Sequence, residues 1–400
     1  MTQSDPIWND IAMAYATASA RAPGLHERFR AAGFDPAAIL SLDDLSRLPV
    51  LKKETLLALQ RADPPFGGFL AADRARVERI YVSPGPIFEP SLPGGGGHGL
   101  DVMFRAAGVG SGDIVLNTWS YHLVPAGLLF DEAARAVGAC VIPGGVGNRE
   151  LQAQVIVETG VSAIAASTAF FMALADTVIE TYGRGAWRVR HAFLGGEMGD
   201  WMSKRRRIEA DYGVKTWACY ATADLGLVGY EDGQGEGYVV HPDRVVQICD
   251  PLSGAPLPAG ETGEVVVTTR HADWPMIRFG TGDSAFALES STDSRVLRLS
   301  ALQGRVGAAV KVREIFVYPR VIEEVVIASP GVSAAQAVVE RIDGRDTVSL
   351  ALVLSPGADP VAAQAQAAEA FVRSARIRAD TVNVIDALPE DAPLLVNHKD

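Results

Sequence analysis

Three segments of this 400-residue chain could bring polar groups to a ligand. The first is SPGPIFEPSLPGGGGHG at residues 83–99, where proline and glycine are so frequent that neither a helix nor a strand is expected to persist. Such a segment is either a binding loop or a plain connector. The other two, residues 143–148 and 194–200, are glycine-containing loops after short apolar runs. In open sheets of parallel strands, ligands bind at loops of this kind.

Cysteine spacing and net charge argue against several other kinds of site. Cys140, Cys219 and Cys249 are too far apart for a paired zinc or disulfide motif, so we expect buried free thiols. The formal net charge of −12 argues against a nucleic-acid surface, because contact with a phosphate backbone needs a positive face. A protein of this charge that binds a nucleotide must gather its positive groups locally.

We expect the protein to be cytoplasmic and to have no membrane partner. The segment MTQSDPIWNDIAMAYATASA has acids among its first nine residues and no basic stretch followed by an apolar run, which is unlike a signal peptide. The chain also has no run of about 18 apolar residues that could span a bilayer.

The order of apolar and helical segments predicts the elements that position these loops. Residues 1–80 have a helical pattern with short breaks, for example over 42–59, and 76–82 are expected to form a strand. From residue 113 onward, short apolar runs alternate with helical stretches, which predicts a parallel sheet covered by helices. Close-spaced strand signals over 238–270 then predict an antiparallel sheet or small barrel attached to this α/β body.

The pattern changes again near Gly304. Strand signals, helical stretches near 322–328 and 360–376, and an Asp-Gly turn signal at 343–344 predict a small α+β module. The predicted fold class is therefore α/β, with a large N-terminal domain over residues 1–303 and a small C-terminal α+β domain over 304–400.

Six segments occur in a fixed order along the chain: ACVIPGGVGNRELQ, LGGEMG, YATADLG, DPLSGAPLPAGETGEVVVTT, PMIRFGTGD and GRVGAAVKVREIFVYPRVIEEV. Together they resemble the phenylacetate–coenzyme A ligase family over nearly the whole chain. Any one of them alone would be weak evidence. The resemblance implies an adenylate-forming, AMP-forming acyl–coenzyme A ligase that activates an aromatic or other hydrophobic acid with ATP and Mg²⁺. It also implies that the small domain rotates about a hinge between the two reaction steps.

The resemblance assigns five residues to the nucleoside part of the site. Gly195, Gly196 and Glu197 match the segment that lies along the adenine, where glycine lets the backbone approach a flat ring; a helix cap is the alternative. Tyr220 matches the tyrosine of an aromatic–glycine–acid motif. Asp283 matches the aspartate that accepts both ribose hydroxyls, a role that suits its two acceptor oxygens.

The same resemblance assigns residues to the phosphates and to catalysis. Ser83 and Gly85 fall in the phosphate loop, and Asp224 falls where the family has a glutamate that holds Mg²⁺, although an isolated aspartate is more often a cap or a surface residue. Arg305 matches an arginine that reaches nucleotide oxygens, with an interdomain salt bridge as the alternative. Lys399 lies near the position of the adenylation lysine, or is a solvated terminal residue.

For the acid-binding cavity, the resemblance points to residues 120–127 and 167–171. Tyr121, His122, Phe170 and Phe171 would form an aromatic slot with a polar corner, in which His122 is a hydrogen-bonding residue and not a base. Aromatic residues on helices are also often ordinary core, so both roles stay open.

The chain departs from the family in the groups that should hold phosphate and coenzyme A. Relatives have serine and threonine around glycines and end the phosphate loop in Lys-Pro, whereas this chain has SPGPIFEP. The prolines remove backbone N–H donors, and Glu89 replaces the lysine, so the usual grip on the β- and γ-phosphates is not expected. Glu314 replaces a glycine of the pantetheine tunnel, and Gly307 replaces the hinge aspartate.

Three functions therefore remain open. The first is an acyl–coenzyme A ligase with a remodelled phosphate loop. The second is an adenylating enzyme whose acceptor is an amine or a carrier-protein thiol. The third is a catalytically impaired homologue that binds a nucleotide or an acyl compound. A homodimer is compatible with each of them.

Overall fold

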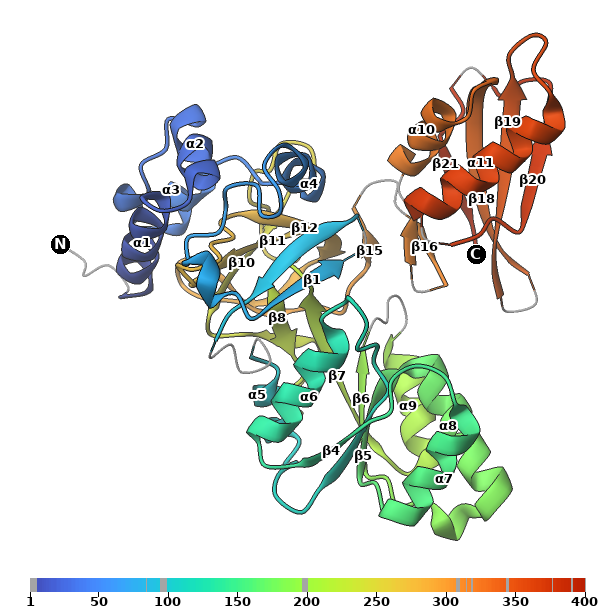
Figure 1. The fold of residues 1–400 in the computed structure, drawn as a ribbon. Helices are drawn as coiled ribbons and strands as arrows, with labels where there is room; N and C mark the ends of the chain where they lie inside the picture. The colour runs from blue at the N-terminus through green and yellow to red at the C-terminus, as the bar shows by residue number, and fades with distance from the viewer. Residues whose placement is uncertain are drawn as a thin grey trace. The chain divides into compact units, whose positions relative to one another are not determined.

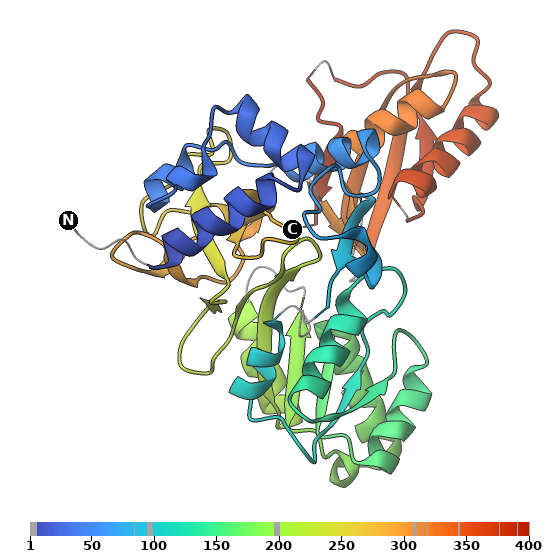
Figure 2. The ribbon, with the colours of Figure 1, turned by 60° about the vertical axis from the view of Figure 1, so that its left-hand side comes forward.

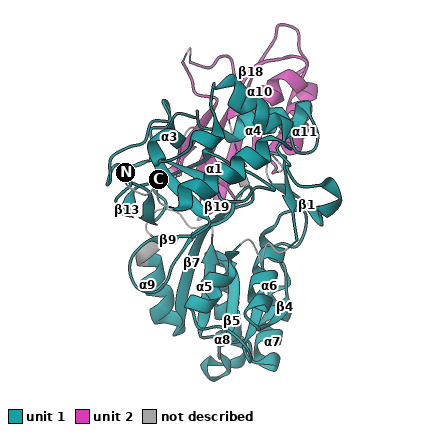
Figure 3. Cartoon of the chain, turned by 90° about the vertical axis from the view of Figure 1, so that its left-hand side faces the viewer, with its two compact units in different colours: residues 1–304 teal, residues 305–400 magenta. Residues whose placement is uncertain are grey.

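The computed structural model describes residues 6–83, 85–93, 99–195, 201–306, 310–313, 315–317, 319–342, 345–375, 377–389 and 391–399. The chain divides into two compact units, residues 1–304 and residues 305–400 (Figure 3).

A nine-stranded sheet runs through unit 1, with the strand order β13-β14-β9-β8-β7-β6-β5-β3-β4 (Figure 1). The pairs between β4, β3, β5, β6 and β7 are parallel, as the alternation of apolar and helical segments predicts. The pairs that join β7, β8, β9, β14 and β13 are antiparallel, so the sheet is mixed and not purely parallel. Its strands are β3 (Ile114–Asn117), β4 (Cys140–Pro143), β5 (Ala163–Ser167), β6 (His191–Gly195), β7 (Lys215–Thr222), β8 (Gly226–Tyr230), β9 (Tyr238–Val240), β13 (Ala287–Ser290) and β14 (Val296–Leu299).

Alternation along the central strands gives the sheet two apolar faces. In β5, Ala163 and Ala165 join one hydrophobic cluster, whereas Ile164 and Ala166 join another. Side chains that alternate in this way point to opposite faces of a sheet. Residues from α5 and α6 complete the first cluster, and residues from α7, α8 and α9 complete the second. These helices are α5 (Asp101–Ala106), α6 (Ala126–Ala136), α7 (Arg149–Thr159), α8 (Thr168–Tyr182) and α9 (Trp201–Tyr212).

The N-terminal helices pack beside a smaller sheet with the strand order β10-β11-β12-β15, in which the pairs among β10, β11 and β12 are antiparallel (Figure 2). A hydrogen bond connects α1 to this sheet: the Tyr15 hydroxyl of α1 donates to the Thr269 carbonyl of β11 at 2.9 Å. The helical stretch expected over 42–59 is two helices, separated around Pro49. The elements are α1 (Pro6–Ser19), α2 (Pro23–Ala31), α3 (Leu42–Ser46), α4 (Lys53–Ala62), β10 (Arg244–Cys249), β11 (Gly263–Thr269), β12 (Phe279–Ala285) and β15 (Gly304–Arg305).

The glycine- and proline-rich segment contains a strand, so the prediction that none persists there was wrong. Strands β1 (Arg79–Ser83) and β2 (Ile87–Ser91) form an antiparallel hairpin in which Ser83 is opposite Ile87. The side-chain amide of Gln60 in α4 also binds the backbone of Phe88, donating to its carbonyl at 2.8 Å and accepting from its N–H at 2.9 Å. These tertiary hydrogen bonds outweigh the local effect of the prolines.

Unit 2 is an α+β module with its own apolar core. Its four-stranded sheet has the order β20-β19-β18-β21, and α11 contributes Ala363, Ala367 and Phe371 to the core. The Asp-Gly turn signal at 343–344 lies outside the described residues. The elements are β16 (Val310–Val312), β17 (Ile315–Val317), α10 (Pro319–Ala328), β18 (Val332–Ile342), β19 (Arg345–Leu354), α11 (Pro360–Ala375), β20 (Thr381–Val384) and β21 (Leu395–His398).

The three cysteines are free thiols, but their burial differs from the expectation. Cys249 is buried, whereas Cys219 is half-buried and Cys140 is exposed. Cys140 begins β4, which is the last strand of its sheet, and an edge position leaves side chains open to solvent. Among the described residues, no helix combines the length and apolar character needed to cross a membrane.

Candidate active site

Two residues assigned to the nucleoside, Tyr220 and Asp283, lie in direct contact in unit 1. The Tyr220 hydroxyl in β7 donates to Oδ2 of Asp283 in β12 at 2.9 Å, across 63 residues of sequence. The Asp283 backbone N–H donates to the Thr281 hydroxyl at 3.1 Å, which fixes the strand locally. Both side chains are largely buried, so the Asp283 carboxylate has a defined orientation.

In the β1–β2 hairpin, the side chains of Ser83 and Glu89 face the protein interior, whereas Ser83 was expected to contact phosphate. Both residues are buried, and the Ser83 hydroxyl donates a short hydrogen bond to Oε1 of Glu89. Ser83 therefore contacts the glutamate that replaces the loop lysine. Gly85 lies in the turn between the two strands, and Pro84 lies outside the described residues.

Asp224 lies in the turn between β7 and β8, and its side chain is 1% exposed. Its Oδ2 accepts from Nζ of Lys53 at 2.9 Å, and its Oδ1 has no hydrogen-bond partner among the described residues. Lys53 is the first residue of α4, 171 positions away in sequence. Sequence reasoning missed Lys53, because only the packing of α4 in unit 1 brings it to Asp224.

Burial and the negative charge of Asp224 together raise the pKa of Glu89 well above its usual range. The hydrogen bond from Ser83 and the positive charge of Lys53 act in the opposite direction but are weaker. The geometry agrees, because α4 contacts Asp224 through Lys53 and Phe88, the residue before Glu89, through Gln60. The hairpin, the β7–β8 turn and the start of α4 thus form one polar cluster.

This cluster fits a divalent cation. The described residues contain no group of three or more histidine, cysteine, aspartate or glutamate side chains that could hold a metal by themselves. Mg²⁺, however, is usually held through one or two carboxylates, with water and substrate phosphates as its other ligands. The buried Oδ1 of Asp224, which lacks a partner in the described part of the chain, is an oxygen ligand of that kind.

Of the three residues expected along the adenine, the structure describes Gly195 alone. Gly195 ends β6, next to Ser167 of β5. A Cβ at this position would come within 3.3 Å of the Trp119 ring, so the absence of a side chain lets the backbone lie against an aromatic face. Gly196 and Glu197 lie outside the described residues.

In the expected acid pocket, Tyr121 is held by its neighbours, whereas His122 is exposed. The Tyr121 hydroxyl accepts from the Asn117 side chain at 2.8 Å and donates to Oδ2 of Asp131 at 3.2 Å. Burial and the Asp131 charge raise the pKa of Tyr121, so it stays a neutral hydrogen-bonding group. The histidine makes a backbone contact, from its N–H to the Ser120 hydroxyl at 3.2 Å.

The two phenylalanines of α8 differ in their surroundings. Phe171 is completely buried and makes edge-to-face contacts with Trp187 and Tyr212, at centroid distances of 6.0 and 5.8 Å. This placement gives Phe171 a role in core packing and does not support a role in the pocket wall. Phe170 is only partly buried beside the same core.

The remaining predicted site residues, Arg305 and Lys399, belong to unit 2. Arg305 lies in β15, and Lys399 follows β21 directly. Nζ of Lys399 contacts Oδ2 of Asp346 at 3.2 Å, and both side chains are mostly buried. Burial alone would raise the pKa of Asp346, but Arg341 and Lys399 lower it below its usual value. Lys399 is therefore an ion-paired residue in this structure.

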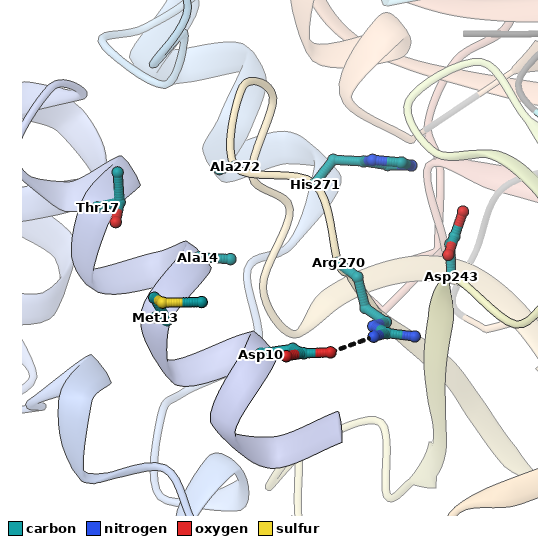
Figure 4. A pocket seen from close by; sticks show the side chains of 8 residues that line it. All are labelled: Asp10, Met13, Ala14, Thr17, Asp243, Arg270, His271 and Ala272. Atoms are coloured by element: carbon teal, nitrogen blue, oxygen red, sulfur yellow. Dashed lines mark hydrogen bonds and ion pairs between the residues drawn. The ribbon is translucent and has the colours of Figure 1, made fainter. Parts of the chain in front are cut away.

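A separate cavity of about 480 Å³ lies between α1 and the loop that follows β11 (Figure 4). Asp10 on α1 and Arg270 on the loop form an ion pair of 2.6 Å along it. None of the predicted site residues lines this cavity. The lining residues are Asp10, Met13, Ala14, Thr17, Asp243, Arg270, His271 and Ala272.

Solved structures place the fold among adenylate-forming ligases, which confirms the predicted fold class. The chain is similar to 2-hydroxyisobutyryl-CoA ligase, crystallised with 2-HIB-AMP and CoA in the thioesterification state, with a TM-score of 0.86 at 21% identity. That comparison covers 100% of this chain and 90% of the ligase. The amide bond synthetase McbA from Marinactinospora thermotolerans has a TM-score of 0.55 at 17% identity, over 78% of this chain and 65% of McbA.

Sequence comparison with curated proteins is more specific. The chain is 30% identical to the phenylacetate–coenzyme A ligase of Thermus thermophilus over 344 residues, which is 81% of this chain and 75% of the relative. It is 27% identical to the phenylacetate–coenzyme A ligase of Aromatoleum evansii, over 84% of this chain and 78% of the relative. No protein-family model matches the chain. The chain belongs to the phenylacetate–coenzyme A ligase family, and it is an enzyme of the acid–thiol ligase class.

Proposed function

We propose that this enzyme activates an aromatic or other hydrophobic carboxylic acid with ATP and transfers the acyl group to coenzyme A. The observation that supports this proposal best is the hydrogen bond between Tyr220 and Asp283, made beside the turn that presents Asp224. A nucleoside site and a cation site next to one another are what adenylation requires.

In the proposed first step, an oxygen of the acid carboxylate attacks the α-phosphorus of ATP. The bond from that phosphorus to the bridging oxygen breaks, pyrophosphate leaves, and an acyl-adenylate remains. In the second step the sulfur of coenzyme A attacks the acyl carbon, its thiol proton is lost, and AMP leaves. Adenylation thus removes the negative charge of the carboxylate and provides a leaving group.

We assign the nucleoside to Asp283 and Tyr220. Asp283 has two oxygens that can accept from the two ribose hydroxyls, and the hydrogen bond from Tyr220 holds the carboxylate in one orientation. Because that orientation exists before the nucleotide binds, little rotational freedom is lost on binding. Gly195 has no side chain, so its backbone could lie directly against the adenine.

We assign Mg²⁺ to Asp224, where the ion would offset the charge of the phosphates. Lys53 donates to Oδ2 of Asp224 and so orients this carboxylate, while Oδ1, which has no hydrogen-bond partner among the described residues, remains available to the ion. In unit 2, Arg305 and Lys399 are proposed to serve the nucleotide and the acid. For Lys399, this role requires its contact with Asp346 to open.

For the acid itself, we propose a pocket near Tyr121, His122 and Phe170. The Tyr121 hydroxyl offers one fixed polar group, and Phe170 offers an aromatic surface. Pockets for small ligands commonly combine a few positioned polar groups with apolar walls. Phe171 is left out of this proposal because it packs in the core.

The test is exchange of labelled pyrophosphate into ATP across a panel of aromatic and aliphatic acids. The proposal expects exchange that depends on the acid and is lost in Asp283→Ala. Thr177→Ala is a suitable control, because the Thr177 hydroxyl only donates to the carbonyl one turn earlier in α8. Absence of exchange with every acid, in a protein that binds ATP, would contradict the proposal.

A second candidate is a homologue that binds the nucleotide or acyl compound without turnover. The buried contact between Ser83 and Glu89 favours it, because the phosphate loop directs these groups inward. An increase in thermal stability on adding ATP or an adenylate analogue, with neither exchange nor thioester, would support this candidate. Hydroxamate formation with hydroxylamine, but no thioester with coenzyme A, would instead indicate another acceptor.

A further inference from the structure

We propose that Glu89 and Asp224 together form a two-carboxylate site that binds a divalent cation before any nucleotide is present. The inference is independent of turnover, although its place in the reaction rests on the proposed function. It makes Glu89, in the loop that the resemblance assigns to phosphate, a cation ligand.

The first support is the state of the two carboxyl groups. Glu89 is 2% exposed and Asp224 is 3% exposed. Oε2 of Glu89 and Oδ1 of Asp224 are both buried, and neither has a hydrogen-bond partner among the described residues. An oxygen withdrawn from water without a partner is costly, so two of them in one cluster indicate that a ligand supplies the missing contacts.

The second support is how the other oxygen of each carboxyl group is used. Oε1 of Glu89 accepts from the Ser83 hydroxyl, and Oδ2 of Asp224 accepts from Nζ of Lys53. These contacts hold each carboxyl group from one side and leave the second oxygen for a ligand. Ser83 lies in β1 and Lys53 lies in α4, so both contacts come from outside the two segments that carry the carboxylates. Positioned ligands with such outer contacts are typical of metal sites.

The third support is charge. Helix α4 contacts Asp224 through Lys53 and the residue before Glu89 through Gln60, and the nearby charge of Asp224 raises the pKa of Glu89. A divalent cation would offset the repulsion between the two groups and let both bind it as carboxylates. Oxygen ligands favour a hard cation such as Mg²⁺ or Mn²⁺, whose other coordination positions are filled by water and, later, by phosphate oxygens.

A cation bound by Glu89 and Asp224 would also explain how the loop SPGPIFEP could bind phosphate although it has no lysine. An ionised Glu89 without a cation would repel a triphosphate, because at about 4 Å and an effective dielectric near 20 two like unit charges interact by about 4 kcal/mol. With a cation held between Glu89 and Asp224, the same place attracts phosphate. The positive charge that relatives carry on a side chain would here be carried by a bound ion.

The experiment is a titration of the full chain with Mn²⁺, without nucleotide or acid, in which electron paramagnetic resonance measures the free ion. The wild type is expected to bind one Mn²⁺ per chain in this cluster. Glu89→Gln and Asp224→Asn should each weaken binding by about tenfold or more, because each removes a charged ligand.

Glu264→Gln is the matched control. Glu264 is as buried as Glu89, but its carboxylate is already held by Lys52 and by the N–H of Gly282, so this change should leave Mn²⁺ affinity unaltered. Circular dichroism of each variant establishes that it is folded. A variant that is folded by this measure and binds Mn²⁺ less tightly has therefore lost a ligand and not its fold.

Two results would overturn the inference. One is a folded wild-type protein that binds no Mn²⁺ up to millimolar concentration. The other is binding that Glu89→Gln leaves unchanged, since the ion would then not use this residue. Neither result depends on pyrophosphate exchange. Mn²⁺ binding without exchange would contradict the proposed ligase activity but support the cation site.

Discussion

Lys53 is expected to stabilise unit 1 through its contact with Asp224. Lys53→Met removes the ammonium and keeps a side chain of similar length. The Asp224 side chain is 1% exposed and that of Lys53 is 20% exposed, so the change leaves a carboxylate in a desolvated place. Breaking a buried ion pair from one side costs about 3–5 kcal/mol. Since Lys53 keeps some contact with water, we expect the lower limit, about 3 kcal/mol.

Tryptophan fluorescence during urea unfolding measures this loss in the relevant unit. All six tryptophans precede residue 305, so the signal reports on unit 1 alone. A chelator in the buffer excludes stabilisation by divalent cations. Arg207→Met is the control, because the Arg207–Asp211 pair is an exposed contact within α9 and should contribute about 0.5 kcal/mol or less.

The double variant Lys53→Met with Asp224→Asn separates the ion pair from other effects of Lys53. If the pair is the cause, the double variant loses about 2 kcal/mol less than the sum of the single variants. A loss below about 1 kcal/mol in Lys53→Met, or strict additivity in the double variant, would refute this reasoning.

Three further changes test the rest of the site. Tyr220→Phe removes the hydrogen bond to Asp283 and should raise the KM for ATP about tenfold with little change in kcat, measured by pyrophosphate exchange; an unchanged KM would contradict this role. Phe171→Ala should destabilise unit 1 by about 3–5 kcal/mol in urea unfolding and leave acid preference unaltered; a changed preference with normal stability would place this residue in the pocket. Lys399→Ala should slow adenylation far more than thioester formation from a presynthesised adenylate; equal slowing would argue against its assignment.

The elements that follow local patterns could be predicted from the sequence. The parallel strands and their covering helices were predictable because apolar runs alternate with helical stretches along the chain. The antiparallel half of the sheet was harder to place, since β9 and β14 pair across more than fifty residues. Strand β2 was missed because its pairing with β1 and its contacts with Gln60 outweigh its proline content.

The chemistry of the site depended more strongly on tertiary contacts. The resemblance to the family located Tyr220 and Asp283, but their hydrogen bond exists only because β7 and β12 meet in space. The sequence also gave no sign that Glu89 is buried against Ser83, or that Lys53 lies at Asp224. Charge in a loop is naturally interpreted as solvated, and burial can be known only from the fold.

The most direct test of the ligase assignment is a quenched reaction of the full chain with ATP, Mg²⁺, coenzyme A and a panel of carboxylic acids, analysed by mass spectrometry. AMP and an acyl–coenzyme A are expected in equal amounts, formed only when a suitable acid is present. Formation of ADP, or of no AMP with any acid while ATP is bound, would contradict the ligase assignment.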